Sequence, residues 1–180
     1  LITETNVPNH ENLTYFGNQN EAHLIYNFAL PPLLIQALLT GSEYYLKKWL
    51  MEMPPTQEGC AYLNFIASHD GIGLRPASGF LMAEDVSELI DTIKSFGGEI
   101  SMRTDNSGQE KPYEMNISLF DALKGTIEGE DEWQRARFLA AQTIMMALEG
   151  VPAFYIHSLL ATKNDYKKYQ KTKHKRCINR

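Results

Sequence analysis

Short runs of apolar residues alternate along the chain with longer segments in which apolar positions recur every three or four residues. A short and continuously apolar run is typical of a strand buried on both faces, and the periodic pattern is typical of an amphipathic helix. The sequence therefore predicts strands at Leu1–Thr3, Leu24–Ala29, Ala61–Ala67 and Ala153–Ser158. Leu1–Thr3 has the composition expected for the last residues of a buried strand.

Helices are predicted between these strands. One begins at Pro31-Pro32 and continues over Leu33–Leu50, with a break and a new start at Gly41-Ser42. Two more helices are predicted over residues 84–96 and 130–149, where glycine residues end the periodic pattern. Between them lies a polar excursion, in which GEISMRT and PYEMNIS are expected to be two extended pieces around DNSGQ.

Apolar strands separated by helices indicate a parallel sheet with both faces covered, so the fold class is α/β. Polar residues follow three of the strands, as Glu4-Thr5-Asn6, His69-Asp70 and His157-Ser158. Ligand groups at the carboxyl ends of several strands are typical of an open α/β sheet or of a β/α barrel. An open sheet would normally carry a glycine-rich phosphate loop. The sequence has none, which favours a fragment of a (β/α)8 barrel.

Composition and charge narrow the picture. The length of 180 residues and an apolar content of 43% are typical of one globular domain. The net charge of −5 is uneven, because residues 163–180 contain eight basic residues and one acidic residue. This basic segment is interpreted as a solvated surface segment, and the alternative of a nucleic-acid arm has no aromatic and basic pattern elsewhere to support it.

Cysteine content and hydropathy bear on the setting of the protein. Cys60 and Cys177 are too few and too far apart to predict a disulfide framework or a metal cluster, which fits a reducing, cytoplasmic setting. No apolar window is long enough to predict a membrane span. We therefore expect no nucleic-acid or membrane partner and no metal or other cofactor.

Two carboxylates, Glu4 and Asp70, are predicted at the ends of two different strands. Paired carboxylates suit glycosyl transfer, in which one protonates the leaving oxygen and another stabilises positive charge at the anomeric carbon. The structural alternative stays open, because acidic residues at strand ends also serve as caps or salt-bridge partners. His69 can likewise be a structural hydrogen-bonding residue.

Several motifs in order carry a resemblance: ITETNVPNHENLTYFG, YNFALPPLL, FIASHDGIGLRPASG, PYEMNIS and EGVPAFYIHSLL, followed by CINR at the end. Together they resemble the retaining α-glucoside phosphorylases of glycoside hydrolase family 13, the sucrose-phosphorylase subgroup, from Ile2 to Arg180. The resemblance implies that residues 1–162 are the C-terminal half of a catalytic (β/α)8 barrel, about strands 5 to 8. Residues 163–180 would lead toward a C-terminal β domain.

The resemblance also implies roles for individual residues. Glu4 matches the general acid/base and Asp70 the transition-state stabiliser, while His69 and Arg180 match residues that hold the glucosyl unit. Tyr113 and Glu114 match a mobile loop that alternately meets acceptor and phosphate, and Arg75 is a candidate anion contact. To act as an acid Glu4 would need a raised pKa, which we expect from burial or nearby negative charge, whereas Asp70 must stay ionised. The glycines after Asp70 are expected to let the acceptor-side loop pass close to the sugar.

The sequence departs from the family pattern in two respects. The family's nucleophile is an Asp near the end of the fourth strand, and no Arg-x-Asp precedes Glu4 in these residues. If the 180 residues are the whole polypeptide, we expect no turnover, and exposed barrel edges would invite self-association. True sucrose phosphorylases carry His where this sequence has Asn6, and HDGIGLRPASG also differs from theirs. Both changes favour the branch that acts on glucosylglycerate, whose carboxylate an arginine would bind.

Three functions remain open at this point. The first is a phosphorylase that transfers a glucosyl unit between glucosylglycerate or sucrose and inorganic phosphate, giving α-D-glucose 1-phosphate. The second is a hydrolase of the same barrel, with water as the acceptor. The third is a catalytically silent fragment that associates with itself.

Overall fold

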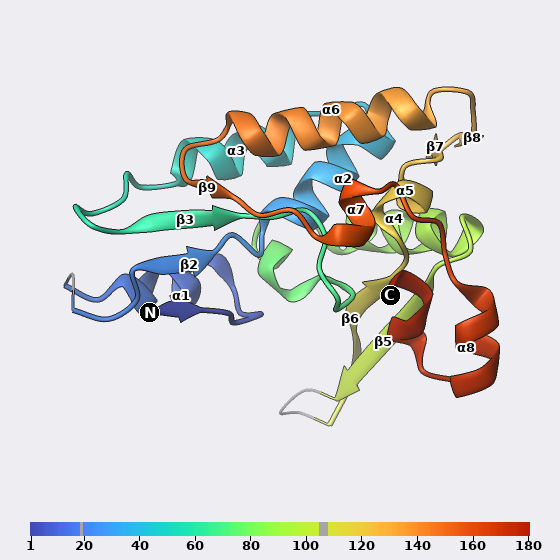
Figure 1. Ribbon diagram of the computed structural model, residues 1–180, viewed down its shortest axis with the longest axis horizontal. Coiled ribbons are helices and arrows are strands. Elements are labelled where there is room, and N and C mark those ends of the chain that lie inside the picture. The colour runs from blue at the N-terminus through green and yellow to red at the C-terminus, as the bar shows by residue number, and fades with distance from the viewer. Residues whose placement is uncertain (19, 105–107) are drawn as a thin grey trace.

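The structure is a computed structural model that describes residues 1–18, 20–104 and 108–180 (Figure 1). Its central sheet has four strands, β1 (Ile2–Thr3), β2 (Leu24–Tyr26), β3 (Ala61–Asn64) and β9 (Val151–Pro152). They lie in the order β1-β2-β3-β9, and each neighbouring pair is parallel. The parallel arrangement confirms the α/β class.

Two of the predicted strands are confirmed with shorter bounds, namely β2 and β3. The first predicted strand also exists, but its burial was predicted wrongly: Leu1 and Ile2 are 73% and 56% exposed. β1 is an edge strand that pairs only with β2 among the described residues, so no described strand pairs with its outer side.

The predicted strand Ala153–Ser158 is wrong. The strand is β9, and Ala153 makes the last ladder bond, donating its backbone N–H to the Asn64 carbonyl at 2.7 Å. Because β3 ends at Asn64, the chain beyond has no strand to pair with, and it forms helix α7 (Ile156–Leu159) instead. His157 therefore lies on a helix, where its Nδ1 is 3.2 Å from Thr162 Oγ1.

The helices predicted from periodicity are confirmed. Pro31 and Pro32 lie in the first turn of the first of them, and Gly41 ends it with a left-handed φ of 71°, a conformation that glycine adopts without strain. The main helices are α2 (Leu30–Thr40), α3 (Tyr44–Glu52), α4 (Ala83–Ser95) and α6 (Gln134–Ala147). Helices α3 and α6 lie along one side of the central sheet (Figure 1).

Short elements connect these parts. They are the helices α1 (Asn9–Leu13) and α5 (Leu119–Ala122), the 3-10 turns η1 (Thr14–Phe16) and η2 (Arg75–Ala77), and the small strands β7 (Gly125–Thr126) and β8 (Gly129–Glu130). Sequence periodicity did not predict them, because each is too short to show a repeat.

The two predicted extended pieces form a hairpin, β5 (Glu99–Thr104) and β6 (Glu110–Asn116). Strand β6 also pairs with β4 (Ile72–Gly73), so the hairpin joins the loop that follows β3. The hairpin extends away from the central sheet (Figure 1). Of the predicted DNSGQ link, residues 105–107 lie outside the described residues.

The basic C-terminal segment is folded. It forms helix α8 (Tyr166–Thr172) and the 3-10 turn η3 (Lys175–Asn179). Ile178 and Asn179 are buried, and η3 lies beside β6 (Figure 1). The interpretation of the whole segment as a solvated surface segment is therefore wrong for η3, although α8 has no buried residue.

The main core is built mainly from helices α2, α3, α4 and α6 and strands β4 to β6, and it includes Leu33, Trp49, Ile93 and Met115, all fully buried. A second, smaller cluster consists of Phe16, Ala22, Ile25 and Tyr62, and it brings together residues of β2, β3 and η1. No helix among the described residues is long and apolar enough to cross a membrane.

Tyr62 makes the smaller cluster sensitive to alkaline pH. Burial, and then the negative charge of Glu149, raise the pKa of Tyr62 to about 12, and its hydroxyl donates to the Pro54 carbonyl at 2.7 Å. Because the folded pKa lies above the unfolded value near 10, the stabilisation is complete below pH ~10 and is lost as the pH rises toward ~12.

In urea unfolding at pH 7 to 11, Tyr62→Phe should cost about 1 kcal/mol at pH 7. Its stability should fall less between pH 10 and 11 than that of the parent chain. An equal fall in both would contradict this prediction.

Candidate active site

His69 and Asp70 lie where the chain leaves the central sheet. β3 ends at Asn64, and the buried residues Phe65 and Ile66 lie between the end of this strand and the His69–Asp70 pair. Ser68 then accepts a hydrogen bond from the Asp70 backbone N–H at 3.1 Å, which fixes the turn. The position of the pair just beyond the carboxyl end of a parallel strand is the one that the sequence predicted.

The Asp70 carboxylate is held through one oxygen. Oδ1 accepts from Arg176 Nη1 at 2.6 Å and from Arg180 Nη2 at 3.3 Å, and His69 Nε2 lies 3.5 Å from it. Among the described residues, Oδ2 has no hydrogen-bond partner from the protein. With about 30% of its side chain exposed, Asp70 has one anchored oxygen and one open to a ligand.

The backbone of the same corner is tied to η3 as well. Asn179 Nδ2 donates to the Asp70 carbonyl at 2.9 Å, and Arg180 Nε donates to the His69 carbonyl at 2.5 Å. Arg180, which was predicted together with His69 as a sugar-binding residue, is thus brought to the His69–Asp70 corner from 110 residues further along the chain.

Arg176 and Asn179 are site residues that the sequence analysis missed. Arg176 binds Asp70 and also makes two bonds to Glu114, from Nε at 3.1 Å and from Nη2 at 2.6 Å. The Glu114 hydrogen bond, despite partial burial, and the two nearby negative charges raise the pKa of Arg176 above its ordinary value. The available signal was the motif RCINR, in which two arginines flank apolar Ile178 within an otherwise polar tail.

Glu114 does not face open solvent. Its side chain is 4% exposed and both of its oxygens bind Arg176, whereas the preceding residue Tyr113 is half-buried on the other face of β6 beside Arg103. Neighbouring residues of a strand point to opposite faces. Tyr113 and Glu114, which were predicted to act together on one loop, therefore have different neighbours.

Glu4 lies directly after β1 and is exposed, so the burial that we expected around it is absent. The reason is again the edge position of β1, whose outer side has no paired strand among the described residues. Its charge reaches Tyr26 on the adjacent strand: burial, and then Glu4, raise the pKa of Tyr26. No hydrogen bond or ion pair joins Glu4 to Asp70 among the described residues.

Asn6 and the glycines of HDGIG lie close together. A Cβ added to Gly73 would lie 2.6 Å from Asn6 Nδ2, and one added to Gly71 would lie 2.9 Å from Glu114 Cβ and 3.0 Å from the Met115 carbonyl oxygen. The glycines therefore allow this loop to approach Asn6 and strand β6 closely. The close approach to the sugar that we expect of the same loop stays a prediction.

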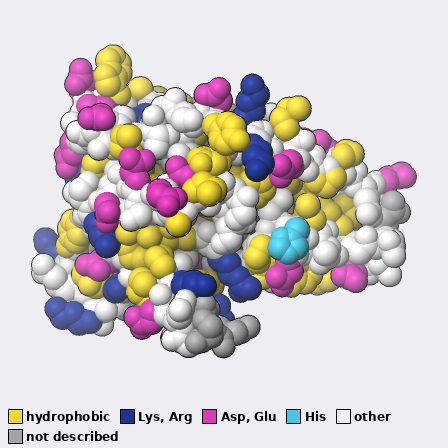
Figure 2. Space-filling view, turned by 180° about the vertical axis from the view of Figure 1, so that it is seen from behind, with side chains coloured by type: hydrophobic (Ala, Val, Ile, Leu, Met, Phe, Trp, Pro, Cys, Tyr) yellow, Lys and Arg dark blue, Asp and Glu magenta, His cyan; other side chains and the backbone are white. Residues whose placement is uncertain are grey.

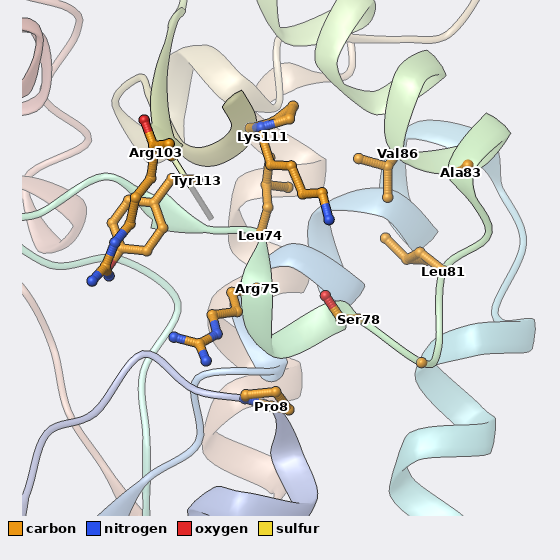
Figure 3. A pocket seen from close by; sticks show the side chains of 13 residues that line it. Pro8, Leu74, Arg75, Ser78, Leu81, Ala83, Val86, Arg103, Lys111 and Tyr113 are labelled. Carbon is orange, nitrogen blue, oxygen red and sulfur yellow. The ribbon is translucent and has the colours of Figure 1, made fainter. Parts of the chain in front are cut away.

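A hollow of about 930 Å³ opens between η2, the start of α4 and the hairpin. Arg75, Arg103, Lys111 and Tyr113 line its basic side, and Arg103 lies over the Tyr113 ring at 5.3 Å (Figure 3). Leu81 and Val86 form the opposite, apolar side (Figure 3). Lys and Arg side chains also gather at the lower edge of the face in Figure 2, near the hairpin. Three cationic side chains around one hollow favour an anionic ligand.

The predicted site residues thus fall into two neighbouring groups and one separate residue. Asp70 and Glu114 bind Arg176, with His69 and Arg180 beside Asp70, and Asn6 lies next to Gly73. Arg75 and Tyr113 line the hollow, where Pro8 brings in the segment after Asn6. Glu4 stands apart at the end of β1. The described residues contain no group of three or more His, Cys, Asp or Glu side chains that could hold a metal ion.

No family model matches the sequence, but individual proteins do. The glucosylglycerate phosphorylase of Spirochaeta thermophila is 45% identical over the whole chain, which covers 30% of that protein. The sucrose phosphorylase of Bifidobacterium adolescentis is 31% identical over 87% of the chain and 31% of that protein. The crystal structure of sucrose 6F-phosphate phosphorylase from Thermoanaerobacter thermosaccharolyticum matches the whole chain with a TM-score of 0.82 at 25% identity, over 34% of its own length.

The chain spans about a third of the length of each of these proteins, and all three are named as phosphorylases. Sequence and fold agree over the full set of motifs from which the resemblance was drawn. This chain therefore belongs to the α-glucoside phosphorylases of glycoside hydrolase family 13, the subgroup that contains the glucosylglycerate and sucrose phosphorylases.

Proposed function

We propose that this sequence forms part of a retaining phosphorylase that converts an α-glucoside and inorganic phosphate reversibly to α-D-glucose 1-phosphate. The observation that carries the proposal is the Asp70 carboxylate, which is anchored through Oδ1 and open at Oδ2 at the carboxyl end of a parallel strand. A fixed anion at that place opposes the positive charge that grows at the anomeric carbon in the transition state.

The other residues have separate roles in this proposal. Glu4 donates a proton to the oxygen of the leaving acceptor as the bond from that oxygen to the anomeric carbon breaks and the anomeric carbon bonds to the family's nucleophilic Asp, which the longer protein would supply. It later takes the proton of phosphate as a phosphate oxygen bonds to the anomeric carbon and the bond to the nucleophile breaks. His69, whose side chain is 59% exposed, binds a hydroxyl of the glucosyl unit, and Arg180 holds the His69–Asp70 corner and the same sugar. Asn6 borders the acceptor side, next to Gly73.

Glucosylglycerate is the favoured substrate, ahead of sucrose. The hollow beside Tyr113 offers the guanidinium of Arg75, which has no hydrogen bond or ion pair to the described part of the protein. Glycerate and phosphate are both anions, and fructose is neutral, so a basic hollow favours the first two. The identity of 45% to a glucosylglycerate phosphorylase, against 31% to a sucrose phosphorylase, points the same way.

The sheet fits the second half of a barrel. Its four parallel strands follow the order of the chain, as expected for strands 5 to 8, with residues 1–162 as this half and residues 163–180 leading toward a further domain. The edges β1 and β9 leave Ile2 and Val151 exposed and would accept further strands. In the isolated chain we propose that they support self-association instead. We also propose that the protein is located in the cytoplasm.

The isolated chain is proposed to be inactive, since it contains no residue that matches the family's nucleophile and Glu4 is exposed on an edge. The test is phosphate release from α-D-glucose 1-phosphate with D-glycerate, with fructose or with no acceptor. It is run with the 180-residue chain and with a protein of the relatives' length that carries it.

We expect release by the longer protein with glycerate only. In that protein Arg75→Gln should raise the KM for glycerate about 10- to 100-fold, as expected when a charged hydrogen bond is lost. Lys94→Gln, which removes an exposed charge on α4, should not. Release without any acceptor would indicate the hydrolase, and silence of both proteins would contradict the proposal.

A further inference from the structure

The guanidinium of Arg176 joins two carboxylates that come from different parts of the fold. Nε and Nη2 bind the two oxygens of Glu114 on β6, and Nη1 binds Oδ1 of Asp70 after β3. All three nitrogens are therefore in use. Arg176 itself comes from η3, so three separate segments of the chain meet at this one side chain.

The two bonds to Glu114 determine where the third nitrogen points. A guanidinium is planar and rigid, so fixing Nε and Nη2 against one carboxylate also fixes the direction of Nη1. Glu114 is itself well placed to do this, because it is buried in the middle of a small sheet, paired with Gly73 on one side and Ser101 on the other. The position of β6 thus determines, through Arg176, the direction from which the Asp70 carboxylate is bound.

The direction of that carboxylate decides whether its open oxygen meets a ligand. The bond to Nη1 at 2.6 Å is the shortest that Asp70 makes, and it engages the same oxygen as Arg180 and His69. The two carboxylate oxygens are chemically equivalent, so the position of the whole group is what matters, and a rotation about χ1 of Asp70 would turn it away from the ligand. The bond from Arg176 opposes that rotation.

We propose that Glu114 and Arg176 are a positioning pair for Asp70, which hold its carboxylate so that Oδ2 faces the ligand. Glu114 is then a positioning residue rather than a residue that contacts acceptor or phosphate. The inference rests on the proposed function only for the identity of the ligand, a glucosyl unit. A lysine cannot replace Arg176, because a single ammonium group cannot hold Glu114 through two bonds and also reach Asp70 in a fixed direction.

A simpler role has to be distinguished from this one. Arg176 also neutralises the buried Glu114 carboxylate, and loss of one partner of such a pair destabilises a protein whatever else the pair does. The double variant Arg176→Gln/Glu114→Gln removes both charges of the pair and leaves no unpaired buried charge. If the pair has only a structural role, the Asp70 side chain should keep its fixed conformation in this variant, as in the parent. If the pair positions Asp70, that side chain should lose its fixed conformation.

The first test uses the 180-residue chain and needs no activity. NMR three-bond couplings of the Asp70 β-protons report whether its side chain keeps one χ1 rotamer. We expect one rotamer in the parent chain and in the control Lys171→Gln, which removes an exposed charge from the same segment. We expect averaged couplings in Arg176→Lys and in the double variant. A single Asp70 rotamer in the folded double variant would overturn the proposal, and if that variant does not fold, Arg176→Lys and Glu114→Gln decide in the same way.

The second test uses turnover by the longer protein. Arg176→Lys and the double variant should lower kcat on the order of tenfold to a hundredfold and leave the KM for α-D-glucose 1-phosphate nearly unchanged, since alignment is lost in the transition state. Unchanged kcat in both variants would overturn the proposal. Failure of the proposed function looks different: the parent protein would then release no phosphate with any acceptor, and the Asp70 couplings would still decide the role of Arg176.

Discussion

Asp70→Asn is expected to lower kcat by about 10²- to 10³-fold in a phosphorylase of the relatives' length that carries this sequence. Asn keeps the size of the side chain and can still accept at Oδ1, but it removes the negative charge. The two arginines that bind Asp70 would remain beside an anomeric carbon that becomes positive in the transition state, and only Arg176 would keep a carboxylate partner, Glu114. Initial rates of phosphate release at saturating glycerate and α-D-glucose 1-phosphate measure the effect.

The control for Asp70→Asn is Asp91→Asn on α4, which removes an exposed carboxylate whose nearest cation is Lys94 at 3.9 Å. It should leave kcat within about twofold of the parent, as is usual for an exposed pair. The loss in Asp70→Asn should appear in kcat rather than in KM, because the charge acts mainly on the transition state. A change confined to KM would show that Asp70 only binds the sugar, and our assignment of its role would be wrong.

Trp49→Ala should have the largest effect on folding, a loss of about 3 to 5 kcal/mol from the free energy of unfolding. Trp49 is fully buried in the main core, and its indole Nε1 donates to Asn9 Oδ1 at 3.4 Å. The side chain thus ties α3 to the start of α1, the segment that follows Asn6 and Pro8. Urea unfolding followed by far-UV circular dichroism measures the loss.

The matched control is Trp133→Ala, which removes a tryptophan that is 61% exposed just before α6. Its effect should stay within about 0.5 kcal/mol, as is usual for surface substitutions. Similar losses in the two variants would mean that the cavity left by Trp49 collapses at little cost, against the expectation for a close-packed core.

Patterns local to the sequence predicted much of the fold correctly. Strands β2 and β3, the helices α2, α3, α4 and α6 and the β5–β6 hairpin all lie within a few residues of their expected positions. The break at Gly41 was also predicted, because a glycine followed by serine is a local signal for the end of one helix and the start of another. These features depend on residues close together in the chain, which is why they can be predicted from it.

The errors have a common cause. The run Ala153–Ser158 is apolar enough for a strand, but β3 has ended where it would need a partner. Burial was one of the two causes expected to raise the pKa of Glu4, yet Glu4 is exposed because β1 is at an edge. The basic segment was judged from its charge, although Arg176 faces two carboxylates more than 60 residues away. In each case the structure depended on whether a segment distant in the sequence packs against the residues concerned.

The sequence by itself determined the α/β class, the helices, the family resemblance and the placement of His69 and Asp70 at the end of a strand. Only the tertiary structure decided which oxygen of Asp70 is anchored, that Glu114 binds Arg176, and that Arg75 and Arg103 line one hollow. The physical reason is range. Periodicity and turn chemistry act over a few residues, whereas an ion pair depends on where segments far apart in the chain are packed.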